Sequence, residues 1–184
     1  MRGIRQIFAA PALAAATLAA FGPAQVLAQR ETAPPIRANT PCEFGAAMVA
    51  ELRNGSETVI FADRVSTPVK LAPRPEDDPI VRGLIEDWNR QPPTSLLRAC
   101  PRIAAHLPPN VRLATAEEMA ATGGIRRVPM QKSVSLPVMN RRRTHLLVRI
   151  IIECGGLCGE GAVQHYEKTA AGWVRRPDVT MWIS

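Results

Sequence analysis

Two cysteines, Cys154 and Cys158, stand four positions apart in a glycine-rich stretch, and this pair is the clearest candidate for chemistry in the chain. A C-x3-C pair can cycle between thiol and disulfide, or deliver copper, when it lies between a strand and a helix whose N-terminus stabilises a thiolate. Here a strand is predicted before the pair, over 145–153, but a Gly-Glu-Gly step and an alternating, strand-like segment follow it. We therefore interpret the pair as the disulfide-stapled tip of a β-hairpin, with a redox switch as the alternative.

The three histidines, His106, His145 and His165, are the other candidates. A hairpin centred on Leu157 would place His165 opposite Ile150, too far from both cysteines to share a metal ion at about 3.3 Å per residue. The sequence contains no G-x-S-x-G motif, no H-E-x-x-H motif and no glycine-rich loop ahead of a helix. We therefore assign no catalytic, cofactor-binding or metal-binding residue, and a non-enzymatic function is favoured.

The first 28 residues have the pattern of a secretory signal peptide. Two arginines precede an apolar run, Ile7 to Leu18, and Val26-Leu27-Ala28 resembles a cleavage site. The uninterrupted apolar part is shorter than the roughly 20 residues that cross a bilayer, so no transmembrane segment is expected after cleavage. Residues 29–41 contain three prolines and are expected to form a disordered leader, and 42–184 a single domain. Export predicts a periplasmic or secreted location.

The charge of the chain is positive, with 23 Lys and Arg residues against 16 Asp and Glu residues. Removing the two arginines of the signal peptide leaves 21 − 16 = +5. The arginines are scattered along the sequence and aromatic residues that could stack on bases are scarce, which favours a solvated basic surface over nucleic-acid binding. The arginine turn, Arg141 to Arg143, is a candidate for docking an acidic partner surface.

All four cysteines follow the expected cleavage site, and an even number in an exported protein predicts disulfides. Four cysteines allow three connectivities, of which the simplest pairs Cys42 with Cys100 and Cys154 with Cys158. In the chain-entropy relation, the disulfide that closes the long loop would add about 4 kcal/mol to the free energy of unfolding, and the disulfide that closes the short loop would add about 2 kcal/mol. The long-range bridge would therefore matter more for stability.

Periodicity and capping residues predict an α+β fold. Helices are expected over 42–53 and 78–91, each with a capping residue and a proline at its start, with a single turn over 102–107 and a short helix after Thr115. Extended segments or strands are expected over 57–65, 95–100, 111–114, 134–138, 145–153, 162–168, 173–175 and 179–183. Pro137 marks an edge strand or a bulge. We expect a C-terminal antiparallel β-meander of four or five strands, packed with two or three helices from the N-terminal half.

The C-terminal half also carries a set of short motifs. They are Ser135 to Asn140, His145 to Glu153, the turn Cys154-Gly-Gly-Leu-Cys-Gly-Glu-Gly161, Tyr166 to Lys168, Gly172-Trp173 and Trp182 to Ser184. In these motifs the chain resembles a widespread group of uncharacterised exported bacterial proteins with a C-terminal CGGLCGxG hairpin. The N-terminal half is similar through Thr58 to Asp63 and Thr94 to Arg98. The resemblance implies a shared fold and carries no activity, cofactor or catalytic residue with it.

These observations favour an exported, periplasmic protein that works as a non-enzymatic binding or envelope-accessory module, with a protein or another envelope component as its partner. The alternative is a thiol-redox or metal-handling protein that uses Cys154 and Cys158.

Overall fold

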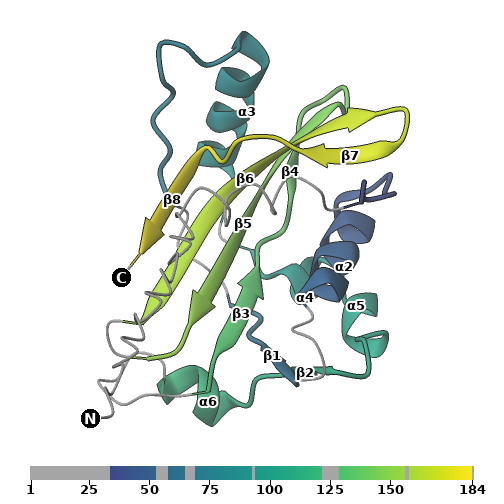
Figure 1. Ribbon diagram of the computed structural model, residues 1–184, viewed down its shortest axis with the longest axis vertical. Helices are drawn as coiled ribbons and strands as arrows, with labels where there is room; N and C mark the ends of the chain where they lie inside the picture. Colours follow the sequence, from purple (N-terminus) through teal and green to yellow (C-terminus); the bar gives the residue numbers. More distant parts are fainter. Residues whose placement is uncertain are drawn as a thin grey trace, which may run out of the picture. The chain divides into compact units, whose positions relative to one another are not determined.

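A computed structural model describes residues 34–52, 58–64, 69–92, 94–121, 129–155 and 158–183, so the expected signal peptide lies outside the described residues. Within this part of the chain, five helices and eight strands make an α+β fold, as the sequence predicts (Figure 1). The helices are α2 (Pro41–Glu51), α3 (Pro79–Arg90), α4 (Leu96–Ala99), α5 (Arg102–Ala105) and α6 (Ala116–Ala121). The strands are β1 (Val59–Phe61), β2 (Val111–Leu113), β3 (Gln131–Val134), β4 (Val138–Met139), β5 (His145–Glu153), β6 (Gly159–Thr169), β7 (Gly172–Arg175) and β8 (Thr180–Ile183).

The eight strands belong to one mixed sheet with the order β2-β1-β3-β5-β6-β7, in which β4 also pairs with β5 and β8 with β6. Strand β1 runs parallel to β2 and to β3, and the other ladders are antiparallel. The expected C-terminal meander is therefore part of a larger sheet, because two short strands that precede it in the sequence, β1 and β2, join it through parallel ladders. The long hairpin β5–β6 lies in its middle (Figure 1).

The strand beside β5 is interrupted at residues 135–137. Strands β3 and β4 lie on either side of the interruption, and both pair with β5. Pro137 has no N–H to donate, so the ladder cannot continue through it. Ser135 bridges the break, because its N–H donates to the Arg149 carbonyl (2.9 Å) and its Oγ accepts from the Arg149 N–H (2.9 Å). Pro137 thus separates β3, which pairs with both β1 and β5, from β4, which in the described ladders pairs with β5 alone, in agreement with the edge-strand alternative.

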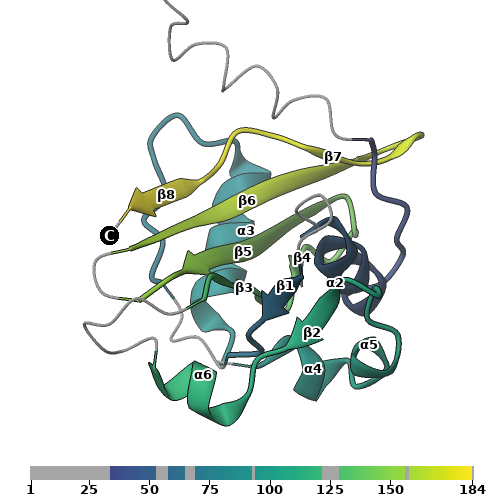
Figure 2. The same ribbon diagram turned by 60° about the horizontal axis from the view of Figure 1, so that its bottom comes forward.

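Helices cover both faces of the sheet (Figures 1 and 2). Successive strand residues point to opposite faces, so Leu146 and Val148 of β5 pack towards α2 and α4, and Leu147 packs towards α3. The first cluster contains Phe44, Met48, Val49, Leu96, Tyr166 and Trp173, and the second contains Leu84, Ile85, Trp88 and Val163. All three β5 residues are buried, so this central strand is covered on both faces at this part of its length.

The two longer helices begin where the sequence predicts. Thr40 caps α2, because its Oγ1 accepts from the Glu43 N–H (3.2 Å), and Pro41 occupies the first turn. Asp78 caps α3 in the same way, since its Oδ1 accepts from the Ile80 N–H (2.7 Å). These local contacts explain why both helix starts could be read directly from the sequence.

Residues 95–100 are not the predicted strand, because residues 96–99 form the one-turn helix α4. Ser95 caps it by accepting from the Arg98 N–H (3.0 Å), and its hydroxyl donates to the Asp63 carboxylate. The other Asp63 oxygen accepts from the Leu97 N–H (3.0 Å). A carboxylate 34 residues away in the sequence thus stabilises the helix start, and no local pattern reveals that contact.

The expected disordered leader over 29–41 is wrong for residues 36–38. Ile36 and Trp173 exchange two backbone hydrogen bonds, 3.1 and 2.8 Å long, and Ile36 is only 6% exposed. The Trp173 indole N–H donates to the Ala38 carbonyl (2.8 Å). Ile36 and Ala38 belong to the same buried cluster as Trp173, and the burial of apolar surface offsets the entropy lost on ordering this segment.

Candidate functional site

The structure contains two disulfides, Cys42–Cys100 with a Cα–Cα distance of 5.5 Å and Cys154–Cys158 with one of 5.3 Å. They correspond to the simplest of the three connectivities that the sequence allows. The first joins the initial turn of α2 to the residue after α4, and its half-cystine Cys100 is 4% exposed. The second closes the end of the β5–β6 hairpin. The two bridges therefore have different surroundings, one at the core and one at a strand turn.

The Cys154–Cys158 pair lies between two strands, because β5 ends at Glu153 and β6 begins at Gly159. The Cys154 N–H donates to the Cys158 carbonyl (3.0 Å), and the Cys158 N–H donates to the Gly155 carbonyl (3.1 Å). Gly155 has a φ of 76°, which a glycine adopts without strain. Since a strand follows the pair directly, no helix N-terminus stands there to stabilise a thiolate. The apolar turn residue Leu157 lies outside the described residues.

The register of the β5–β6 hairpin differs from the prediction. The prediction places His165 opposite Ile150, whereas the ladder pairs His165 with Leu147. The difference arises because Glu153 pairs with Gly159, which centres the turn earlier than the prediction assumes. At about 3.3 Å per residue, His165 then lies about 23 Å along the strand from the nearer cysteine.

This register brings His145 and His165 together, a contact that the sequence reasoning missed. His145 Nδ1 and His165 Nε2 are 3.1 Å apart, and the two rings are only 18° from parallel. One ring donates its N–H to the other. Burial, together with the neighbouring His145, lowers the pKa of His165. A turn centred two residues after Cys154 would have revealed this diagonal pair.

The His145–His165 pair is not part of a three-ligand metal cluster among the described residues. Across the described part of the chain, no three side chains of His, Cys, Asp or Glu lie close enough together to hold a metal ion. The hydrogen bond between the rings instead requires one neutral imidazole to accept from the other. The pair therefore joins neighbouring strands through their side chains, on the face of the sheet that α3 covers.

The arginine turn, residues 141–143, is exposed between β4 and β5. The Asn140 side chain shapes it, because its Oδ1 accepts from the N–H groups of Thr144 (2.9 Å) and His145 (3.2 Å). A shallow pocket of about 460 Å³ separates Arg141 and Arg142 from α3. The turn is thus held in a defined shape that an acidic partner surface could contact.

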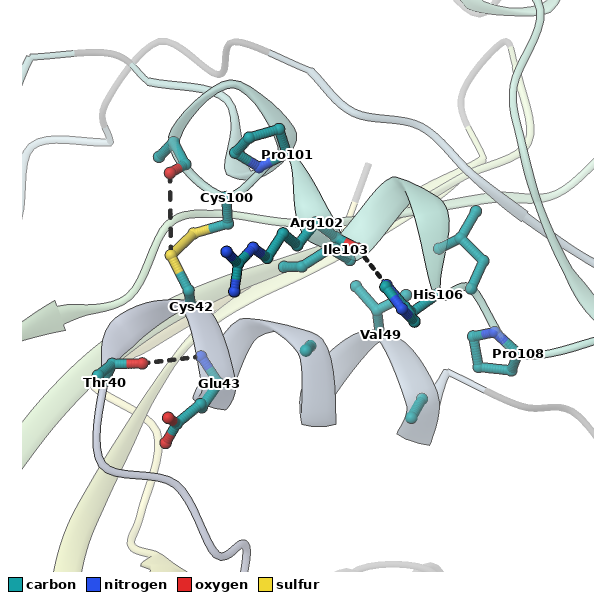
Figure 3. A pocket seen from close by; sticks show the side chains of 14 residues that line it. Thr40, Cys42, Glu43, Val49, Cys100, Pro101, Arg102, Ile103, His106 and Pro108 are labelled. Carbon is teal, nitrogen blue, oxygen red and sulfur yellow. Dashed lines mark hydrogen bonds between the residues drawn. A yellow bond between two sulfur atoms is a disulfide. The ribbon is translucent and has the colours of Figure 1, made fainter.

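Among the described residues, a concave site of about 550 Å³ lies between α2 and α5 (Figure 3). Fourteen residues line it: Thr40, Cys42, Glu43, Ala46, Val49, Ala50, Ala99, Cys100, Pro101, Arg102, Ile103, His106, Leu107 and Pro108. Ten of the fourteen are alanine, valine, isoleucine, leucine, proline or disulfide-bonded cysteine. The cavity wall is therefore largely apolar, and the Cys42–Cys100 disulfide forms one end of it.

Small side chains on α2 leave this space open. Ala46 and Ala50 are four residues apart and lie on the same side of the helix, where longer side chains would fill the gap to α5. Helix α5 itself is only four residues long and is followed by Leu107 and Pro108, which complete the wall. Sequence reasoning missed the cavity. The alanine spacing next to a half-cystine is the signal that could have pointed to it.

Four polar residues stand at the cavity: Thr40, Glu43, Arg102 and His106. Glu43 is already engaged, because a carboxylate oxygen accepts from the Asn39 N–H (2.6 Å). His106 Nδ1 contacts the Arg102 carbonyl (2.9 Å). Figure 3 shows the Arg102 side chain extending from α5 towards Cys42 on α2. The site thus combines an apolar space with one cationic group at its edge.

No protein-family model, no curated protein and no solved structure matches this chain.

Proposed function

We propose that this protein is an exported, non-enzymatic binding module whose ligand site is the cavity between α2 and α5. The observation that carries the proposal is the cavity itself, since its volume of about 550 Å³ falls within the range of small-molecule sites, roughly 300–1,000 Å³. An apolar wall with a few polar groups at the edge is typical of such sites. The expected partner is a small apolar or amphiphilic component of the cell envelope.

Two features support export to the periplasm or beyond. The first 28 residues have the pattern of a cleaved signal peptide. Both cysteine pairs form disulfides, which persist in oxidising compartments. Within the described residues, no helix combines the length and the apolar composition needed to cross a bilayer. The proposed membership of a group of exported bacterial proteins with a CGGLCGxG hairpin agrees with this location.

The binding proposal is tested by titrating the oxidised protein with N-phenyl-1-naphthylamine, a neutral dye whose fluorescence rises in apolar surroundings. Ala50→Leu fills part of the cavity, so we expect it to weaken dye binding several-fold. Ala105→Leu is the matched control, because Ala105 is an exposed residue of α5 that does not line the cavity. No binding by the unmodified protein, or equal binding by both variants, would contradict the proposal.

The alternative function is thiol redox chemistry at Cys154 and Cys158. The observation in its favour is that Cys158 is exposed, whereas Cys100 of the other bridge is buried. Thiol trapping of the protein taken from its native compartment tests whether Cys154 and Cys158 undergo redox cycling. A fraction with reduced Cys154 and Cys158 would support cycling, and a fully oxidised pair that resists mild reductant would exclude it.

A further inference from the structure

Within the described residues, the guanidinium of Arg102 is a cation without an ion-pair partner at the mouth of the cavity. Arg102 is an exposed residue of α5, and within the described residues no carboxylate or carbonyl oxygen pairs with its side chain. Other arginines are paired, for example Arg175 with Asp178 and Arg176 with Glu167. The cavity therefore has a free positive group at the edge of an apolar space.

Among the described polar residues that line the cavity, Arg102 is the one with a permanently charged donor group for an anion. Figure 3 shows the Glu43 carboxylate turned away from Arg102, and the Asn39 N–H binds it. The Arg102 carbonyl can only accept, so His106 donates to it through Nδ1, and Nε2 of the neutral ring is an acceptor. Neutral His106 therefore offers no N–H to a bound anion, whereas the guanidinium offers a planar fork of donors.

From this arrangement we propose that the cavity binds an anionic amphiphile, with the apolar chain between α2 and α5 and the carboxylate or phosphate paired with Arg102. This inference rests on the proposed binding function and names the chemical class of its ligand. Guanidinium groups bind both anions through two parallel hydrogen bonds, so the shared chemistry covers a fatty acid and a phosphate-bearing lipid. The positive net charge of the chain also attracts anions.

The test is isothermal titration calorimetry of the full, oxidised protein with three ten-carbon probes below their micelle concentrations: decanoate, decyl phosphate and decanol. We expect the better anion to bind about tenfold more tightly than decanol, a margin typical of one charge-assisted contact. Binding of that anion should weaken as ionic strength rises, whereas binding of decanol should not. The ratio of decanoate to decyl phosphate affinity distinguishes a fatty acid from a phosphate-bearing lipid as the source.

Three variants isolate the role of the cation. Arg102→Gln should reduce the tenfold preference for anions over decanol to near equality, and Arg102→Lys should restore part of that preference. Arg98→Gln is the matched control, because Arg98 is exposed on α4 and does not line the cavity. It should bind all three probes as the unmodified protein does.

The possible failures are distinguishable. Equal affinities for decanol and both anions would overturn the amphiphile proposal while the binding function stands. A preference for anions that survives in Arg102→Gln would overturn the role of Arg102. Failure of all three probes to bind would overturn both the amphiphile proposal and the proposed function.

Discussion

The Cys42–Cys100 disulfide closes a loop with a sequence separation of 58, whereas the Cys154–Cys158 disulfide closes one with a separation of 4. Replacing Cys42 and Cys100 together by alanine frees the long loop in the unfolded chain. The chain-entropy relation then gives a loss of about 4 kcal/mol in the free energy of unfolding, against about 2 kcal/mol for the Cys154 and Cys158 double variant. Because Cys100 lies in the core, loss of its packing further lowers the free energy of unfolding of the Cys42 and Cys100 double variant.

The measurement is urea unfolding of the unmodified protein and of both double variants, followed by tryptophan fluorescence. Trp173 and Trp88 are buried, so unfolding changes their emission. The midpoint should fall more for the Cys42 and Cys100 variant, and the dependence on urea should steepen because the unfolded chain exposes more surface. Equal losses for the two variants, or a larger loss for the short loop, would refute the argument that loop length decides the contribution.

Three further predictions concern single positions. Gly83→Ala should raise the free energy of unfolding by about 0.5–1 kcal/mol, because the added Cβ meets no other atom and alanine has the higher helix propensity. Gly161→Ala should lower the free energy of unfolding, because its Cβ would overlap the Trp182 ring. Urea unfolding checks both signs, and a destabilised Gly83→Ala protein would contradict the first. The pKa of His165 is lower in the folded protein than in the unfolded chain, where it is about 6.5. Below about pH 6.5 the unfolded chain therefore binds more protons than the folded protein. The free energy of unfolding should decrease as the pH falls from about 6.5 through the pKa of the folded protein. Unfolding measured from pH 8 to pH 5 should show this loss, and an equal loss in His165→Gln would assign it to other groups.

Contacts between residues close in the sequence were the predictable part of this fold. The caps at Thr40 and Asp78 each involve groups two or three residues apart, so the sequence alone locates the starts of α2 and α3. The long apolar run of β5 and the alternation of β6 likewise predict a central hairpin. In each case the pattern that identifies the element is contained within it.

Contacts between distant residues decided the rest. Helix α4 depends on Asp63, and the parallel pairing of β1 with β2 joins segments about fifty residues apart. An error of a few positions in the hairpin register was enough to hide the contact between His145 and His165. The cavity eluded prediction for a different reason, since it is formed by side chains that are too short to fill a space.

The pairing of Ile36 with Trp173 also affects the order in which parts of the protein can fold. A polypeptide is synthesised N-terminus first, and an exported one crosses the membrane in the same direction. Ile36 emerges early, but its partner strand β7 emerges only near the end of the chain. The face of α2 that packs against Trp173 therefore lacks this partner until almost the whole chain has been synthesised, and its apolar surface is open to non-native contacts during that interval.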